Sequence, residues 1–210
     1  MFMLIQVVMV LAKRFTAAIV RYISAQCPDK SKEELEIIGY GLEGVLTTVP
    51  KIAFIITVGY FLNILQPLLC AVLSFGILRT FASGVHLNNG WVCLIFSSIV
   101  FLFIAYAGVY IPLPMLLKIF MFLVSFILLT LYAPADTEER PLVVPRIRQE
   151  LKVSSLIFTG LMFIIMLLLP SGHVIGNIIT YSVIIESVMT TPAIYFILNR
   201  RYRNYEYYET

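Results

Sequence analysis

The chain has 210 residues, of which 60% are hydrophobic and only 13% are charged, and its mean hydropathy is +0.93. Soluble domains are typically about half apolar and about a quarter charged, so this composition indicates an integral membrane protein and argues against a soluble one. The net charge of +3 is too small to indicate a nucleic-acid partner, and three cysteines without a Cys-x-x-Cys pair argue against a disulfide framework or a structural zinc site. We therefore expect no nucleic acid, no metal ion and no cofactor.

The first apolar segment, residues 1–30, is predicted to be an amphipathic helix that lies in the membrane interface. Lys13, Arg14 and Arg21 interrupt its apolar residues, which is typical of an interfacial helix. The basic residues also follow the apolar stretch instead of preceding it, unlike those of a cleaved signal peptide. A short first span is the alternative interpretation.

Apolar runs in the rest of the chain predict transmembrane helices. They lie at roughly 42–65, 66–80, 91–110, 113–133, 153–170 and 174–198. Each is close to the ~20 residues that cross a bilayer, except 66–80, which is short and could instead be re-entrant. The predicted fold class is therefore all-α: a polytopic membrane bundle of about six transmembrane helices in one domain, 1–210. The bundle spans 42–198, and 199–210 form a cytoplasmic tail.

The charged residues predict the orientation of this bundle. The connections at 63–67, 110–114 and 170–173 contain no Lys, Arg, Asp or Glu. Threading six spans with both termini inside places the basic segments before the first run, at 134–152 and in the tail on the opposite side. Because positive charge favours the cytoplasmic side, that side is predicted to be cytoplasmic, and residues 84–93 are predicted to lie there.

His86 and Cys93 form the most distinctive polar pair in the sequence. On one uninterrupted helix they would be ~10.5 Å apart along the axis, whereas a thiol–imidazole pair needs about 3–3.5 Å. Asn88-Asn89-Gly90 is a turn signal, so we expect one helix to end near His86 and another to begin around Trp91. Cys93 would then lie in a first helical turn, which favours a thiolate, and Arg79 could bind a carboxylate or an oxyanion. Ordinary packing of a small apolar Cys is the alternative.

Three ordered stretches carry a resemblance to a known family. They are "GYGLEGVLTTVPK" at 39–51, "RTFASGVHLNNGWVC" at 79–93 and "LYAPADTEERPL" at 131–142. Together with the length and the six-span layout, they resemble the accessory gene regulator protein B (AgrB) family over essentially the whole chain. That family consists of membrane-embedded cysteine endopeptidases that process quorum-sensing propeptides.

The resemblance implies roles for individual residues of the second stretch. Cys93 would be the nucleophile and His86 its general base and later general acid, while Arg79 and Gly84 match positions that the family associates with activity. Ser83 stands where many members carry a second glycine. Ser83 and Gly84 are also candidates for substrate binding.

Charged residues elsewhere in the chain are further candidates for the site. Glu43 could orient His86 as a third catalytic residue, and a buried arrangement of Glu43 with Lys51 is the alternative. Lys51, Arg146 and Arg148 are candidates for substrate binding. Arg146 and Arg148 could hold an acidic part of a peptide or anchor the chain to anionic lipid.

The partners that the resemblance implies are a propeptide with an amphipathic helix and an acidic tail, membrane lipids and a second copy of the chain in a homodimer. The implied location is the bacterial cell membrane, which the chain crosses several times with the active site facing the cytoplasm. Ring closure on the enzyme would release a thiolactone or a lactone. A small peptide transporter or exporter without proteolytic activity is the competing function.

Overall fold

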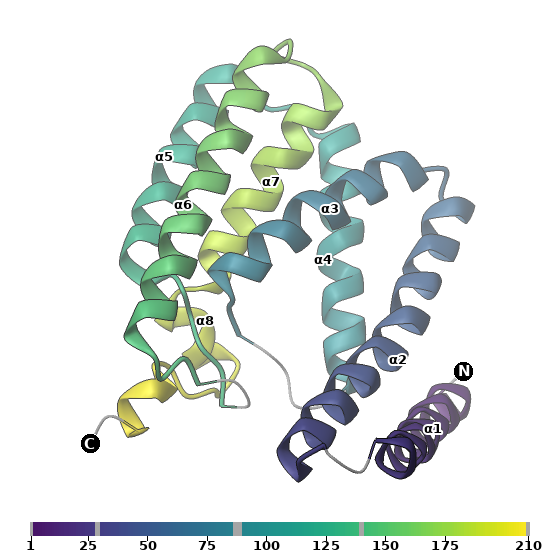
Figure 1. The fold of residues 1–210 in the computed structure, drawn as a ribbon. Helices are drawn as coiled ribbons and strands as arrows, with labels where there is room; N and C mark the ends of the chain where they lie inside the picture. The colour runs from purple at the N-terminus through teal and green to yellow at the C-terminus, as the bar shows by residue number, and fades with distance from the viewer. Residues whose placement is uncertain (1, 28–29, 86–89, 139–140, 209–210) are drawn as a thin grey trace. The chain divides into compact units, whose positions relative to one another are not determined.

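The computed structural model describes residues 2–27, 30–85, 90–138 and 141–208, apart from some side chains in the first, second and fourth helices. The regular elements in this part of the chain are all helices, which confirms the predicted all-α class (Figure 1). The α-helices are α1 Phe2–Gln26, α2 Lys32–Phe61, α3 Leu65–Ala82, α4 Gly90–Tyr110, α5 Met115–Tyr132, α6 Pro145–Leu168, α7 Val174–Met189 and α8 Pro192–Ile197. A short 3-10 helix, Asn204–Tyr208, follows in the tail.

Three of these helices, α3, α5 and α6, are long and apolar enough to cross a membrane. Shorter apolar helical stretches among the described residues are Ile52–Phe61, Ile95–Tyr110 and Val174–Met189. The six-span count and the interfacial position of α1 remain predictions.

The chain divides into two compact units, Met1–Val58 and Gly59–Thr210. In the first unit, α2 begins at Lys32 and not near residue 42 as its apolar run predicted. A capping box explains the earlier start: the Ser31 amide donates to the Glu34 carboxylate at 2.8 Å, and the Glu34 amide donates to the Ser31 hydroxyl at 3.2 Å. The Ser31 amide and the nearby Lys30 ammonium lower the pKa of Glu34.

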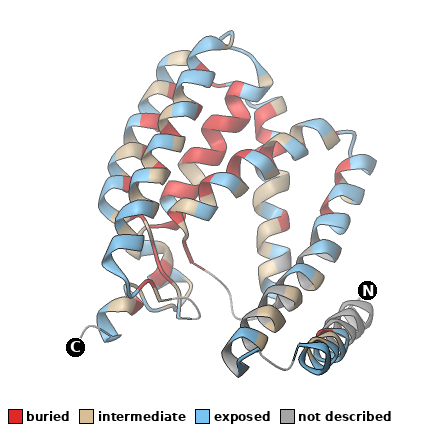
Figure 2. Ribbon diagram, viewed as in Figure 1, coloured by how far each residue is buried: buried red, intermediate tan, exposed pale blue. Residues whose placement is uncertain are grey.

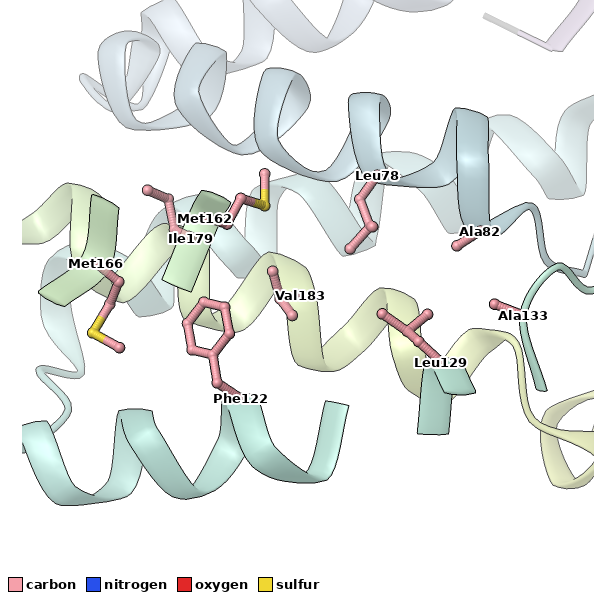
Figure 3. Close-up of a cluster of buried hydrophobic side chains, with 9 residues drawn as sticks. All are labelled: Leu78, Ala82, Phe122, Leu129, Ala133, Met162, Met166, Ile179 and Val183. Atoms are coloured by element: carbon pink, nitrogen blue, oxygen red, sulfur yellow. The ribbon is translucent and has the colours of Figure 1, made fainter. Parts of the chain in front are cut away.

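In the second unit, α7 is the central helix and packs against α3, α4, α5 and α6. Most of its residues are buried, as Figure 2 shows. Apolar side chains from α3, α5, α6 and α7 meet in one cluster (Figure 3). The cluster consists of Leu78, Ala82, Phe122, Leu129, Ala133, Met162, Met166, Ile179 and Val183. Since it joins four helices, this cluster holds the ends of α3 and α5 next to each other.

A buried amide fixes the position of α7 against α4. Asn177 donates to the Gly108 carbonyl at 3.0 Å and accepts from the Leu113 amide at 3.3 Å. A buried amide without such partners would be costly, so these two bonds favour one register between the helices. The helices also approach closely there, because a Cβ added to Gly108 would stand 2.3 Å from Cγ1 of Ile178.

The predicted run 174–198 is wrong as a single helix, because α7 ends at Met189 and α8 starts at Pro192. Proline lacks an amide donor and its ring blocks a continuous helix, which explains the break. Proline is well suited to a first helical turn, and Pro145 accordingly starts α6 before its predicted apolar run at 153.

The uncharged connections of the second unit gather at one end. Asn63, Tyr110 and His173 line a single cavity of about 530 Å³, and Lys118 donates from α5 to the Ser171 carbonyl at 2.7 Å. Residues 83–85 after α3, the described part of the α5–α6 connection and the C-terminal tail lie at the other end (Figure 1). The charged connections therefore lie at the opposite end from the uncharged ones, although the buried Lys118 lies at the uncharged end.

Candidate functional site

The sequence predicts a helix break between His86 and Cys93, and the structure has a break there that begins earlier, after Ala82. The helix α3 ends at Ala82, slightly before the expected position near His86, and α4 begins at Gly90. Two backbone conformations that favour glycine cause the early end: Ser83 has φ 59° and ψ −145°, and Gly84 has φ +136°. Residues 79–93 therefore do not form one straight helix.

Arg79 lies in the last turn of α3 and binds two groups at once. Its Nη1 atom lies 3.2 Å from Oε2 of Glu186, and its Nη2 atom donates to the carbonyl of Val85. The Glu186 side chain is completely buried, whereas the Arg79 side chain is 30% exposed. The carboxylate that Arg79 holds is thus one from its own chain, and the guanidinium also fixes the backbone one residue before His86.

The sequence marks Glu186 as an ionisable residue in an apolar run, which is a general sign of a functional or paired group. No local pattern could reveal its partner, because Arg79 lies 107 positions away in the sequence. In the part of the chain that the structure describes, Oε1 of Glu186 has no hydrogen-bond partner. That oxygen lies 3.6 Å from the position that a Cβ on Gly84 would occupy, so it faces the segment that leads to His86.

The segment after α3 pairs with the one after α5. The Gly84 amide donates to the Ala135 carbonyl, and the Ala135 amide donates to the Ala82 carbonyl, both at 3.0 Å. Ser83 and Ala135 form an isolated parallel bridge. Two of the three stretches that carry the family resemblance therefore lie side by side.

Apolar contacts with α8 stabilise this pairing. Val85, Ala135 and Tyr195 are buried together, and the Tyr195 hydroxyl donates to the Asp136 carbonyl at 2.8 Å. Burial and the nearby Asp136 carboxylate raise the pKa of Tyr195, so this residue stays a neutral donor at physiological pH. No pattern in the sequence indicates that α8 and the tail support the site.

Cys93 is the fourth residue of α4 and so lies in its first turn, as the turn signal predicts. It is a half-buried free thiol, and its carbonyl accepts from the Ser97 hydroxyl at 2.7 Å. Free amides and the positive end of the helix dipole at such a position stabilise a thiolate.

Several predicted site residues cannot be placed relative to Cys93. His86 lies outside the described residues, and so do the side chains of Glu43 and Lys51. The distance from His86 to Cys93 and the role of Glu43 remain predictions. Arg146 and Arg148 line a separate cavity at the start of α6, whose lining does not include Cys93.

Comparison with known proteins gives the family. The model of the family described as accessory gene regulator B matches residues 16–190, a range that contains the helix break, Cys93 and Glu186. The chain belongs to the AgrB family. An AgrB-like protein of Clostridium acetobutylicum is 33% identical over 180 residues, which cover 84% of each chain. An AgrB-like protein of Listeria monocytogenes is 33% identical over 172 residues, or 81% of this chain and 83% of the relative.

A more distant AgrB-like protein, from Lactiplantibacillus plantarum, is 26% identical over 187 residues, which cover 87% of this chain and 88% of the relative. No solved structure matches the chain. AgrB proteins are membrane proteins, which agrees with the three helices long enough to cross a bilayer. Membership of the family supports a role in the agr quorum-sensing system.

Proposed function

We propose that this AgrB-family chain is a membrane-embedded cysteine endopeptidase that cleaves a short autoinducer propeptide and allows its cyclisation. The position of the Cys93 thiol carries the proposal: it lies in the first turn of α4, directly after a helix break that contains His86 in sequence. A helix start favours the thiolate, and the same free amides suit a developing oxyanion.

The proposed reaction has two acyl transfers. His86 takes the proton of the Cys93 thiol, the sulfur attacks a backbone carbonyl of the propeptide, and the C–N bond breaks as His86 returns the proton to the leaving amine. The N-terminal piece then remains as a thioester on Cys93. A thiol or hydroxyl of that piece attacks the thioester, the Cys93 sulfur leaves and takes up a proton, and a thiolactone or lactone ring is released.

Thioester exchange is nearly neutral in free energy, so ring closure must compete with water through proximity and exclusion of solvent. In this scheme Arg79 and Glu186 are positioning residues, because they hold the Ser83–Val85 backbone and do not need to touch the substrate. Glu43 is proposed to orient the His86 imidazole.

The test uses a Cys27→Ser, Cys70→Ser background, in which Cys93 is the only thiol, reconstituted with the propeptide from a small neighbouring reading frame. We expect cleavage in this background, a trapped peptide thioester by mass spectrometry, and no cleavage in Cys93→Ala. Undiminished cleavage by Cys93→Ala would overturn the proposal.

A second assay separates the peptidase from a transporter and does not need the natural substrate. A peptide chloromethyl ketone at neutral pH should label Cys93 rapidly, and His86→Ala should slow the labelling. A transporter predicts slow labelling that is independent of His86. A membrane-impermeant maleimide added to intact cells should spare Cys93 if this end of the bundle faces the cytoplasm.

A further inference from the structure

A cavity of about 490 Å³ lies where α5 ends and α6 begins. Residues 131–136 from the end of α5, residues 145–152 from the start of α6 and residues 202–205 from the tail contribute to its walls. Of the proposed catalytic residues that the structure describes, Arg79 and Cys93, neither lines it, so its chemistry needs an explanation of its own.

The wall formed by the tail is fixed by a buried carboxylate. Asp136 is 2% exposed, and its two oxygens accept from the amides of Asn204 and Tyr205 at 2.9 and 2.7 Å. The Arg148 guanidinium lies over the Tyr205 ring, 3.9 Å from the ring centroid. Arg148 also donates to the Leu142 carbonyl at 3.0 Å. These contacts hold the tail and the start of α6 in place, so the cavity has defined walls.

The cavity is positively charged. The described part of its lining contains four cationic side chains, Arg146, Arg148, Lys152 and Arg203. Among the described residues, the carboxylates near these cations are Asp136, whose oxygens already accept from two amides, and the exposed Glu150 and Glu206, which pair with Arg146 at 2.9 Å and with Arg203 at 3.2 Å. Exposed pairs contribute little free energy, so an anionic ligand can replace them at low cost.

The position of these cations along the helices matches the edge of a bilayer. Leu131 and Tyr132 are the last residues of α5, a candidate span. Lys152 is the last charged residue of α6, since 153–168 contain no Lys, Arg, Asp or Glu. The cations therefore stand at the level of lipid headgroups, with tyrosines beside them as is common at membrane interfaces.

Exposed apolar side chains continue from the cavity toward the spans. Leu131 lines the cavity and is 58% exposed, and Val153 and Ile157, which follow Lys152 on α6, are 53% and 60% exposed. The acidic tail of a propeptide would use the cations but not these apolar side chains. A phospholipid uses both, because its phosphate meets the cations while its acyl chains cover the apolar residues. We infer that this cavity binds the headgroup of an anionic phospholipid.

The test measures binding of dioleoylphosphatidylglycerol and dioleoylphosphatidylcholine to the full chain in neutral detergent, by native mass spectrometry and by the lipid-dependent rise in unfolding temperature. A cation that contacts the lipid headgroup strengthens binding to anionic lipid about fivefold, so Lys152→Gln should weaken phosphatidylglycerol binding ~5-fold. Arg148→Lys, which keeps the charge, should weaken it less than Arg148→Gln. Arg201→Gln is the matched control, because Arg201 is an exposed cation of the same tail that does not line the cavity.

Equal binding of the two lipids, or equal loss in Lys152→Gln and Arg201→Gln, would overturn the inference. Displacement of phosphatidylglycerol by millimolar inorganic phosphate would show a site for a bare anion and would also overturn it. A Glu-rich decapeptide that binds with the same dependence on Lys152, while phosphatidylglycerol does not, would assign the cavity to a peptide instead.

Discussion

Replacement of Gly84 by alanine is the sharpest test of the geometry beside the proposed site. Gly84 has φ +136°, a backbone conformation that residues other than glycine rarely adopt. A residue forced into such a region costs about 1–3 kcal/mol, and the smaller entropy of an unfolded chain with Ala offsets about 0.4–1 kcal/mol. The backbone alone should therefore lower the free energy of unfolding by about 1–2 kcal/mol.

The added methyl group also meets the clamp formed by Arg79 and Glu186. Its Cβ would stand 3.1 Å from Nη1 of Arg79 and 3.6 Å from both Oε1 of Glu186 and the Met189 carbonyl. The guanidinium must shift by a few tenths of an ångström, which weakens its bond to the Val85 carbonyl. We therefore expect Gly84→Ala to slow labelling of Cys93 as well as to destabilise the fold.

Gly76→Ala is the matched control, since Gly76 lies inside α3, the helix that ends just before Gly84, and an added Cβ there meets no atom within 4 Å. Alanine is favoured over glycine in a helix by about 0.5–1 kcal/mol, so this variant should be slightly more stable than the parent. Reversible unfolding in mixed micelles of dodecyl maltoside and SDS would compare the two. If Gly84→Ala were as stable as Gly76→Ala, the backbone conformation that ends α3 would be wrong.

Two further substitutions test the same segment. Ser83→Gly should raise the free energy of unfolding by about 1 kcal/mol in the same micelle titration. Glycine removes the backbone strain at φ 59°, and the greater entropy of the unfolded chain offsets part of this gain. A loss of stability would show that the Ser83 side chain makes a needed contact. Glu186→Gln should lower it by about 1–3 kcal/mol, below the 3–5 kcal/mol of a fully buried pair because Arg79 is partly exposed. Glu150→Gln, which breaks the exposed pair with Arg146, should change it by less than about 1 kcal/mol, and equal effects of the two substitutions would contradict a clamp.

The sequence alone predicted the helical membrane class and most of the turns between helices. Membrane spans need long apolar stretches, and Asn63, Pro114 and Gly172 stand in the turns where the helices end or begin. These signals are local, since a proline or a glycine acts on its own backbone whatever the rest of the chain does. The same reasoning placed Cys93 in a first helical turn.

Where the sequence was less accurate, polar residues competed with apolar periodicity. The capping box of Ser31 and Glu34 starts α2 early, and Pro192 divides the last apolar run into α7 and α8. Hydropathy detects the apolar part of a helix but not the polar turns that extend it.

Only the tertiary structure decided which distant groups meet. Arg79 and Glu186 pair across 107 positions, and Gly84 bonds to Ala135 because the cluster in Figure 3 holds the ends of α3 and α5 together. Arg79 and Glu186 each stand out in the sequence as charged residues next to apolar ones, but no local sequence pattern indicates that they pair. Packing around α7 determines these contacts. The sequence predicts how many helices there are, but not which of them pack against one another.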